Sequence, residues 1–220
     1  MTTPTPTPAA ATTRAPATLR PYRRSDADDL YDVCVRTADA GGDARGQYAS
    51  DRLVGDLFAL PYATLEPDLA FVVDDGTRVV GYVVGTADTP RFVERYRDEW
   101  IPAIAGRYAP APSELTDDAT PDDVMHYLHE HPERLLVPEV APYPAHLHID
   151  LLPGFQGRGL GRRLLETFAS AAADAGARAV HVGMVSANTG ARPFYDALGF
   201  HVIDVPDAGP LTYLGRATRP

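Results

Sequence analysis

The chain has 220 residues, of which 45% are hydrophobic, and these values favour one domain with a sizeable core. Its net charge is −10 and all 20 basic residues are arginines, which argues against nucleic acid or an anionic membrane as the main partner. Without lysine there is no Walker A loop, so ordinary P-loop NTPases are excluded. The chain lacks a long apolar run and a secretory pattern and has one cysteine, so we expect a cytoplasmic protein.

Composition also predicts the domain organisation. Residues 1–18 are rich in Thr, Pro and Ala and carry too little apolar surface to offset the entropy of ordering, so we expect a disordered or extended tail. We expect a single domain over residues 19–220. Within it, residues 90–145 are the least regular third, and their helical periodicity between prolines predicts a helical insert.

The first half of the domain predicts a strand, two helices and a hairpin. A short strand begins near Leu19, a helix containing Leu30 follows, and a second helical stretch covers about 51–59. Asp75-Gly76 lies between two runs of β-branched residues and predicts the turn of a β-hairpin over 69–86.

The second half alternates strands with helices, and the complete order of elements predicts a mixed α/β layer structure. A strand ends at Pro153, a glycine loop follows, and an amphipathic helix runs from the loop to Gly176. We expect a strand, a helix and two further strands after it, at 179–185, 189–198, 200–205 and 211–214.

The glycine loop carries the strongest chemical signal. Glycines at 157, 159 and 161 let backbone amides turn toward one point, and the new helix adds unpaired amides and its positive dipole end. This arrangement suits a phosphate or pyrophosphate. A dinucleotide-binding loop would need its third glycine one residue later, which disfavours a nicotinamide oxidoreductase. A glycine-rich strand–helix turn without a ligand is the structural alternative.

Three motifs together resemble the acetyl-CoA signature of the GCN5-related N-acetyltransferase (GNAT) superfamily. They are Gln156-Gly157-Arg158-Gly159-Leu160-Gly161, Asn188, and the run Phe194-Tyr195-Asp196-Ala197-Leu198-Gly199-Phe200. The resemblance implies the GNAT fold, in which a central, mixed, mostly antiparallel twisted sheet is flanked by helices. The helical insert then precedes the fourth strand.

The same resemblance implies acetyl-CoA as co-substrate, without a metal. The loop amides would hold the CoA pyrophosphate, with Arg158 and Arg162 adding charge-assisted contacts. The main chain around Leu151 would pair with the pantetheine arm, and Asn188 would hydrogen-bond it, although Asn188 also suits a helix N-cap. The implied cofactor-binding residues are Leu151, Leu152, Gln156, Gly157, Arg158, Gly159, Leu160, Gly161, Arg162 and Asn188.

Acetyl transfer to an amine needs an acid and a base. Tyr195 is our first candidate for the acid that protonates the leaving CoA thiolate, the alternative being a core tyrosine. An ammonium group must lose a proton before it attacks, and Asp150 is our first choice for that base, with His148 second. A structural carboxylate is the alternative for Asp150. The histidines at 126, 129 and 131 lack metal-site spacing, so we expect no metal.

A closer resemblance extends over about residues 20–205. Segments such as Gly81-Tyr82-Val83-Val84-Gly85-Thr86 and His148-Ile149-Asp150 are similar to the acetyltransferase-like C-terminal domain of O-GlcNAcases and its stand-alone bacterial relatives. In the animal domain the glycine loop is degraded and catalysis is disputed, whereas here the loop is intact. The resemblance does not include a glycosidase domain, so it implies no hydrolase activity for this chain.

These observations predict an N-acetyltransferase that moves acetyl from acetyl-CoA to a primary amine of a small molecule or peptide. The alternative is an acetyl-CoA-binding pseudoenzyme that acts as a sensor or interaction module. The acceptor is not specified by the sequence, and a homodimer is left open.

Overall fold

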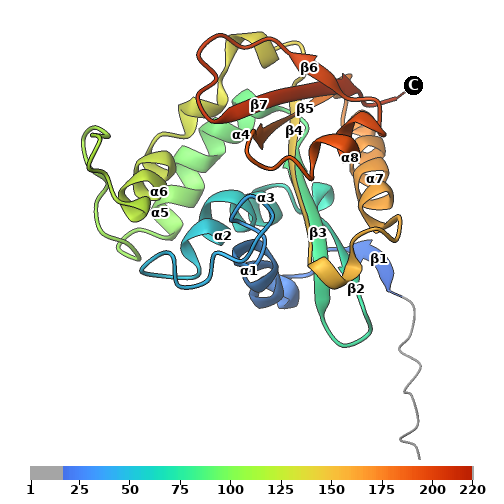
Figure 1. Cartoon of the computed structure of the whole chain (residues 1–220), viewed down its shortest axis with the longest axis horizontal. Helices are drawn as coiled ribbons and strands as arrows, with labels where there is room; N and C mark the ends of the chain where they lie inside the picture. Colours follow the sequence, from blue (N-terminus) through green and yellow to red (C-terminus); the bar gives the residue numbers. More distant parts are fainter. Residues whose placement is uncertain (1–16, 220) are drawn as a thin grey trace, which may run out of the picture.

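A seven-stranded sheet in the order β1-β2-β3-β4-β5-β7-β6 organises this computed structural model, which describes residues 17–219 (Figure 1). Every neighbouring pair of strands is antiparallel except β4 and β5, which are parallel. The prediction of a mixed, mostly antiparallel sheet with a helical insert before its fourth strand is therefore confirmed. The predicted tail lies outside the described residues except for its last two positions, and Thr18 already begins β1.

The elements follow the predicted order, with one addition, since a further helix, α3 (Leu60–Leu65), follows the predicted helical stretch at 51–59. The strands are β1 (Thr18–Pro21), β2 (Phe71–Asp74), β3 (Val79–Thr86), β4 (Ala145–Leu151), β5 (Ala179–Val185), β6 (His201–Ile203) and β7 (Leu211–Ala217). The α-helices are α1 (Ala27–Val35), α2 (Leu53–Phe58), α3 (Leu60–Leu65), α4 (Thr89–Arg95), α5 (Ile101–Ala103), α6 (Pro121–Glu130), α7 (Leu160–Asp174) and α8 (Arg192–Asp196).

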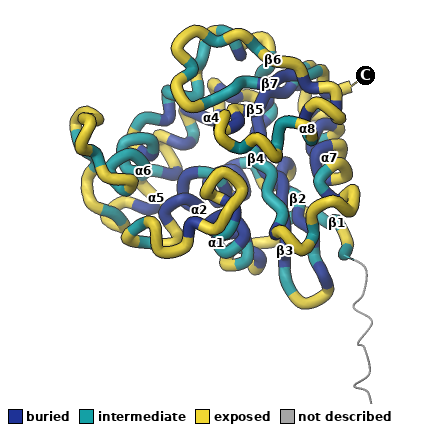
Figure 2. The backbone as a smooth tube through the Cα atoms, in the orientation of Figure 1, coloured by how far each residue is buried: buried dark blue, intermediate teal, exposed yellow. Residues whose placement is uncertain are grey.

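Helices cover both faces of the sheet, and the core lies between them (Figures 1 and 2). On one face α7 buries an apolar stripe that includes Leu164, Leu165 and Phe168. This helix lies close to β3, because a Cβ added at Gly85 would come within 2.7 Å of the Phe168 ring and 2.2 Å of the His146 carbonyl oxygen. Only glycine allows that approach. Helices α1 to α3 cover the opposite face.

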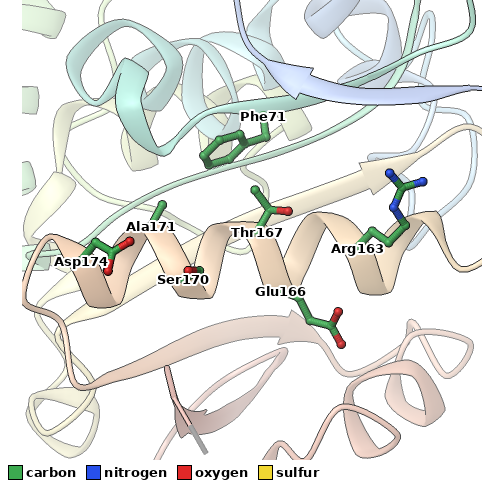
Figure 3. Close-up of a pocket in the computed structure, with 7 residues that line it drawn as sticks. All are labelled: Phe71, Arg163, Glu166, Thr167, Ser170, Ala171 and Asp174. Atoms are coloured by element: carbon green, nitrogen blue, oxygen red, sulfur yellow. The ribbon is translucent and has the colours of Figure 1, made fainter.

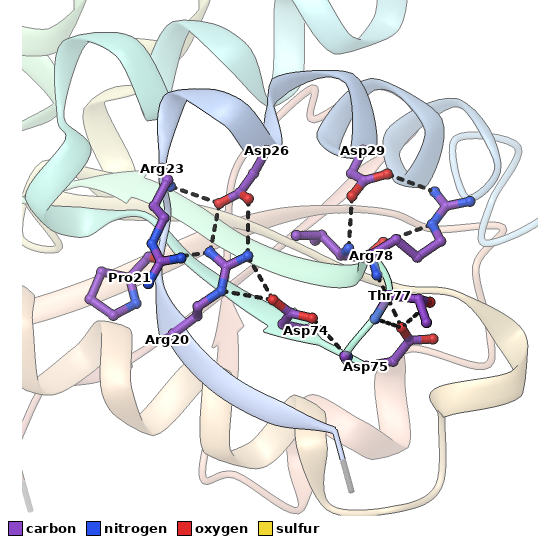
Figure 4. A network of polar contacts seen from close by, with 11 residues as sticks. Arg20, Pro21, Arg23, Asp26, Asp29, Asp74, Asp75, Thr77 and Arg78 are labelled. Atoms are coloured by element: carbon purple, nitrogen blue, oxygen red, sulfur yellow. Dashed lines mark hydrogen bonds and ion pairs between the residues drawn. The ribbon is translucent and has the colours of Figure 1, made fainter. Parts of the chain in front are cut away.

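Charged side chains fasten β1 and α1 to the β2–β3 hairpin (Figure 4). The Arg20 guanidinium binds the carboxylates of Asp26 at 2.7 Å and Asp74 at 2.9 Å. Asp26 also accepts the Arg23 amide, and this hydrogen bond and the Arg20 pair hold its pKa below the ordinary value against the effect of burial. The predicted Asp75-Gly76 turn forms, with the Asp75 carboxylate accepting the Thr77 amide at 2.9 Å.

The insert packs beside α1 to α3 and is held by a buried carboxylate. Asp56 on α2 is fully buried, and its Oδ2 accepts Nη1 of Arg107 at 2.6 Å and the hydroxyl of Tyr108 at 2.5 Å. Its Oδ1 accepts the hydroxyl of Tyr31 from α1. One carboxylate therefore links α1, α2 and the end of the insert's first helical stretch.

Two predicted segments differ from the structure. Prolines at 138, 142 and 144 predict an extended approach to β4. The structure instead has a short 3-10 turn at Pro138–Val140, because proline also suits the first position of a helical turn. Helix α8 is shorter than predicted at both ends, since residues 189–191 and 197–199 form turns. Within residues 17–219, no helix combines the length and apolarity needed to cross a bilayer.

Candidate active site

The parallel strands β4 and β5 pair only at their first residues and then separate. The paired positions are Ala145 with Val180 and His146 with His181, although β4 continues to Leu151. On its other side β4 stays paired with β3 as far as Leu151. The sheet therefore opens along one edge of β4.

Backbone groups of β4 point into this opening. The Leu152 amide donates to the Val80 carbonyl of β3, so alternation along the strand directs the backbone groups of Ile149 and Leu151 to the other edge. Consistent with this direction, the Gln156 side chain donates to the Leu151 carbonyl at 2.8 Å. An extended ligand with its own amides can pair with this edge as a strand would.

The glycine loop joins β4 to α7 at the same place. Gly157 and Gly159 adopt positive φ values of 70° and 74°, which favour glycine, and a Cβ at either position would meet no protein atom within 4 Å. No side chain caps the N-terminus of α7, so its first amides are available to a ligand. The loop therefore offers open space, unpaired donors and a positive dipole end, which fit a pyrophosphate.

A cleft of about 650 Å³ collects most of the predicted site. Its walls include the opening of the sheet, the glycine loop, α8 and the loop after α1. The predicted residues that line it are Asp150, Leu151, Gln156, Gly157, Gly159, Gly161, Arg162, Asn188 and Tyr195.

Four predicted residues do not line this cleft. Leu152 and Leu160 are buried in the core, so only their backbone can serve a ligand. The guanidinium of Arg158 lies 5.5 Å from the centre of the Phe155 ring, in an exposed position. His148 packs against the aromatic rings of Phe58 and Tyr62, which lie on α2 and α3.

Asp150 is the carboxylate of the cleft. It is partly exposed, and its Oδ2 accepts the hydroxyl of Tyr82, a fully buried residue of β3, at 2.5 Å. Burial raises the pKa of Asp150 to about 6, and the hydrogen bond from Tyr82 opposes that rise. A carboxylate with this pKa is ionised at pH 7 and can accept a proton there.

Tyr195 lies on α8 and lines the same cleft. Its side chain is 9% exposed, and the neighbouring rings of Phe194 and Phe200 hold it from two sides. Burial, together with the negative charge of Asp150, raises the pKa of the Tyr195 phenol. The hydroxyl therefore keeps its proton and can donate it.

His148 has a different environment. Its Nε2 lies 3.3 Å from the Tyr62 hydroxyl, and its ring packs against Phe58. Burial lowers the pKa of His148 to about 4, so the imidazole is neutral at pH 7. His146, two residues earlier, binds Tyr62 and Thr89 with its two ring nitrogens.

Asn188 and Arg162 have protein partners as well as positions on the cleft. Asn188 Oδ1 accepts the Ala191 amide at 3.2 Å, and this leaves the side-chain amide hydrogens available. The bond lies in the turn before α8, so Asn188 is not the N-cap that the alternative predicted; that residue is Ala191. Arg162 donates to the Ala197 carbonyl at 3.1 Å and so ties α7 to α8.

The sequence did not single out five further residues of the cleft wall. Thr37, Ala40 and Gly41 follow α1, while Gly190 and Ala191 precede α8. The loop after α1 reaches Asn188, since a Cβ added at Gly41 would lie 3.5 Å from the Asn188 side-chain nitrogen, and no motif in the sequence indicates this contact. A shallower depression on the outer side of α7, between Phe71 and Asp174, contains no predicted site residue (Figure 3).

Comparisons with known proteins agree with this geometry. A family model described as the Acetyltransferase (GNAT) family matches residues 113–200. The crystal structure of SsHAT is 57% identical in sequence and superposes with a TM-score of 0.87, covering 93% of this chain and 99% of that one.

Two more distant relatives are informative. Protein O-GlcNAcase of Rattus norvegicus is 25% identical over 91% of this chain, which spans 22% of that protein's length. The structure of yncA, a putative acetyltransferase from Salmonella typhimurium with its cofactor acetyl-CoA, is 15% identical with a TM-score of 0.53, covering 94% of this chain and 96% of that one. At that identity the likeness concerns the fold.

Proposed function

The chain belongs to the GNAT acetyltransferase family, whose acetyl donor is acetyl-CoA, and from this premise we propose that it acetylates a primary amine by direct attack. The observation that carries the proposal is the cleft in which Asp150 and Tyr195 lie beside an uncapped glycine loop. We treat residues 19–220 as one catalytic domain and propose a cytoplasmic location. A homodimer stays a prediction.

We assign cofactor binding to the backbone of the loop and of β4. The amides of 157–161 hold the pyrophosphate, while Ile149 and Leu151 pair with the pantetheine amides along the open edge. Arg162 and the free amide hydrogens of Asn188 add polar contacts. Bound in this way, acetyl-CoA supplies an activated thioester carbonyl.

The two titratable groups then divide the proton transfers between them. Asp150, directly or through water, takes a proton from the attacking ammonium group and leaves a neutral amine. As the C–N bond forms and the C–S bond breaks, the Tyr195 hydroxyl donates its proton to the leaving sulfur. The second proton, which the acetylated nitrogen gives up, returns to the Tyr195 oxygen directly or through water. Both assignments agree with the directions in which burial moves the two pKa values.

A panel of primary amines, followed by thiol release and product mass, tests the proposal. Tyr195→Phe is expected to lower kcat by about 10²-fold or more while acetyl-CoA binding is retained. Tyr127→Phe, which keeps a ring stacked on His131, serves as the matched control. Binding of acetyl-CoA without turnover of any amine would favour the pseudoenzyme.

A further inference from the structure

Thr37 lines the cleft together with Asp150, at the place where helix α1 ends and the following loop begins. Helix α1 packs against β3 and β4, the strands that carry Tyr82 and Asp150. The Thr37 residue is 7% exposed, so it faces the cleft from a nearly buried position. A hydrogen bond from its hydroxyl opposes the rise in the pKa of Asp150, as the bond from Tyr82 does. The two side chains therefore lie within hydrogen-bonding reach of each other.

Hydrogen bonds within the chain hold Thr37 in place. The backbone amide donates to the Cys34 carbonyl at 3.1 Å, and the backbone carbonyl accepts the Gly41 amide at 3.1 Å. The hydroxyl oxygen lies 2.8 Å from the Val33 carbonyl oxygen and 3.2 Å from that of Cys34. A hydroxyl has one hydrogen and two lone pairs, so donation to Val33 leaves the oxygen free to accept a hydrogen bond. The position of this acceptor is fixed before any ligand binds.

An ammonium group that enters the cleft needs hydrogen-bond acceptors. Within the part of the chain that the structure describes, the polar side chains lining the cleft are Thr37, Asp150, Gln156, Arg162, Asn188 and Tyr195. Gln156, Arg162 and Asn188 bond to backbone groups around the glycine loop and α8, where we assign the cofactor. The Tyr195 hydroxyl donates to the leaving sulfur in the proposed reaction. Thr37 and Asp150 are therefore the pair of acceptors that suits an ammonium group.

The three hydrogens of a primary ammonium group have different fates in the proposed reaction. Asp150 takes the first one before attack. The second leaves the nitrogen after the C–N bond has formed, and it replaces the proton that Tyr195 gave to the sulfur. The third hydrogen stays on the nitrogen of the product amide. Neither titratable group provides a partner for this third hydrogen.

Building on the acetyl transfer proposed above, we propose that the Thr37 hydroxyl oxygen accepts a hydrogen bond from this third hydrogen and thereby makes the site specific for primary amines. The bond persists from the bound ammonium group to the amide, so it holds the nitrogen at the thioester after Asp150 has become neutral. The hydroxyl hydrogen meanwhile stays on the Val33 carbonyl. A secondary ammonium group has two hydrogens, and the reaction consumes both. Its acylation would leave the Thr37 oxygen without a donor, and sites built to hydrogen-bond a substrate reject analogues that lack the bond.

Pairs of amines that differ by one N-methyl group test this inference. The probes are butylamine, glucosamine and Nα-acetyl-lysine amide, each against its derivative methylated on the reacting nitrogen. Thr37→Val and Thr37→Ala remove the hydroxyl, the first at nearly constant volume, whereas Thr37→Ser keeps it. Thr218→Val is the matched control, because Thr218 is also 7% exposed and donates to the Ala177 carbonyl at 2.7 Å, but does not line the cleft.

We expect the wild type to use the primary member of at least one pair about tenfold better, in kcat/KM, or more. Thr37→Ser and Thr218→Val keep this ratio, while Thr37→Val and Thr37→Ala lower it about tenfold because only the primary amine loses a bond. A shift in the pKa of Asp150 affects both members alike and leaves the ratio unchanged. Equal use of both members by the wild type, or an equal loss on both without the hydroxyl, overturns the proposal. So does loss of the rise in Tm with acetyl-CoA in Thr37→Val, which would assign the hydroxyl to the cofactor.

A binding measurement separates this inference from the proposed function. If no probe is acetylated, titration calorimetry of the primary amines into the CoA-loaded protein decides the role of Thr37. Binding about tenfold tighter to the wild type and Thr37→Ser than to Thr37→Val supports the ammonium site even though acetyl transfer has failed. Absence of binding to the wild type, or equal binding to the wild type and Thr37→Val, contradicts it. Turnover with equal use of both members of every pair would retain the proposed function and reject this role of Thr37.

Discussion

Tyr82 donates its hydroxyl hydrogen to Oδ2 of Asp150 across the β3–β4 pair, at 2.5 Å. The donor is fully buried, whereas the acceptor lines the cleft. The hydrogen bond stabilises the ionised carboxylate against the burial that favours its neutral form. A residue of the neighbouring strand β3 thus lowers the pKa of the carboxylate that lines the cleft.

The pH profile should identify the base. With a pKa of about 6, Asp150 loses its proton as the pH rises, so kcat/KM should increase tenfold per pH unit below 6 and level off above it. Asp150→Asn should remove this limb and most of the activity. A limb near pH 4 would point to His148 instead.

The raised pKa of Asp150 also predicts how the stability of the protein depends on pH. The pKa of Asp150 is higher in the folded protein than in the unfolded chain, where it is about 4, so protonation of Asp150 stabilises the folded state at low pH. This stabilisation is lost as the pH rises through about 6. Asp150→Asn should therefore raise the Tm at pH 7 and have little effect at pH 4, as thermal melts at the two pH values would show. A lower Tm at pH 7 would contradict the raised pKa.

Removal of the Tyr82 hydroxyl should shift the acid limb of the pH profile to higher pH. Tyr82→Phe takes away a hydrogen bond to a charged group, which is worth roughly 1.5–3 kcal/mol, so the Asp150 pKa should rise by about one unit or more. The profile of kcat/KM against pH measures the shift. As a control, Tyr62→Phe removes a hydroxyl that hydrogen-bonds to His146 and His148, and it should not shift the acid limb.

A negatively charged side chain introduced into the glycine loop should prevent the loop from binding the pyrophosphate of acetyl-CoA. Saturating acetyl-CoA at about 100 times its Kd adds about 2.7 kcal/mol, or roughly 5–10 °C in Tm. Gly159→Glu should abolish this rise, since φ is 74° there and the side chain would enter the cradle. Gly106→Glu, with φ of 76° and open space around it, carries the same strain away from the cleft and should keep the rise. An intact rise in Gly159→Glu would place the pyrophosphate elsewhere.

The Asp56 network should make a measurable contribution to stability. Asp56→Asn weakens charge-assisted hydrogen bonds from Arg107 and Tyr108, and we expect a loss on the order of 2 kcal/mol, or roughly 4–8 °C in Tm. Asp43→Asn breaks an exposed pair with Arg45 and should change the Tm little. Equal effects of the two substitutions would show that burial of Asp56 is not what matters.

Local signals in the sequence predicted the parts of the fold that depend on near neighbours. The Asp75-Gly76 turn, the apolar stripe of α7 and the glycine loop each depend on residues within one or two elements. Helix α6 likewise begins at a local signal, because Thr120 caps it in a reciprocal pair with Asp123. Motif spacing, together with the family resemblance, therefore predicted that Asp150 and Tyr195 lie near the glycine loop, and all three line one cleft.

Contacts between distant residues could not be predicted in this way. His148 meets Tyr62 across 86 positions, and its depressed pKa follows from that packing. Thr37 belongs to no motif, and only the folded chain places it on the cleft wall with Asp150. The loop after α1 likewise acquires its place on the cleft from tertiary packing.

The separation of β4 from β5 has a consequence for hydrogen–deuterium exchange. The amides of Ile149 and Leu151 lie inside the sheet but have no β5 partner, so they should exchange quickly in the protein alone. A ligand that pairs with this edge would slow both amides while the rest of β4, held by β3, stays protected as before. Exchange at these two residues would thus report how far the cleft is occupied, without any acceptor being known.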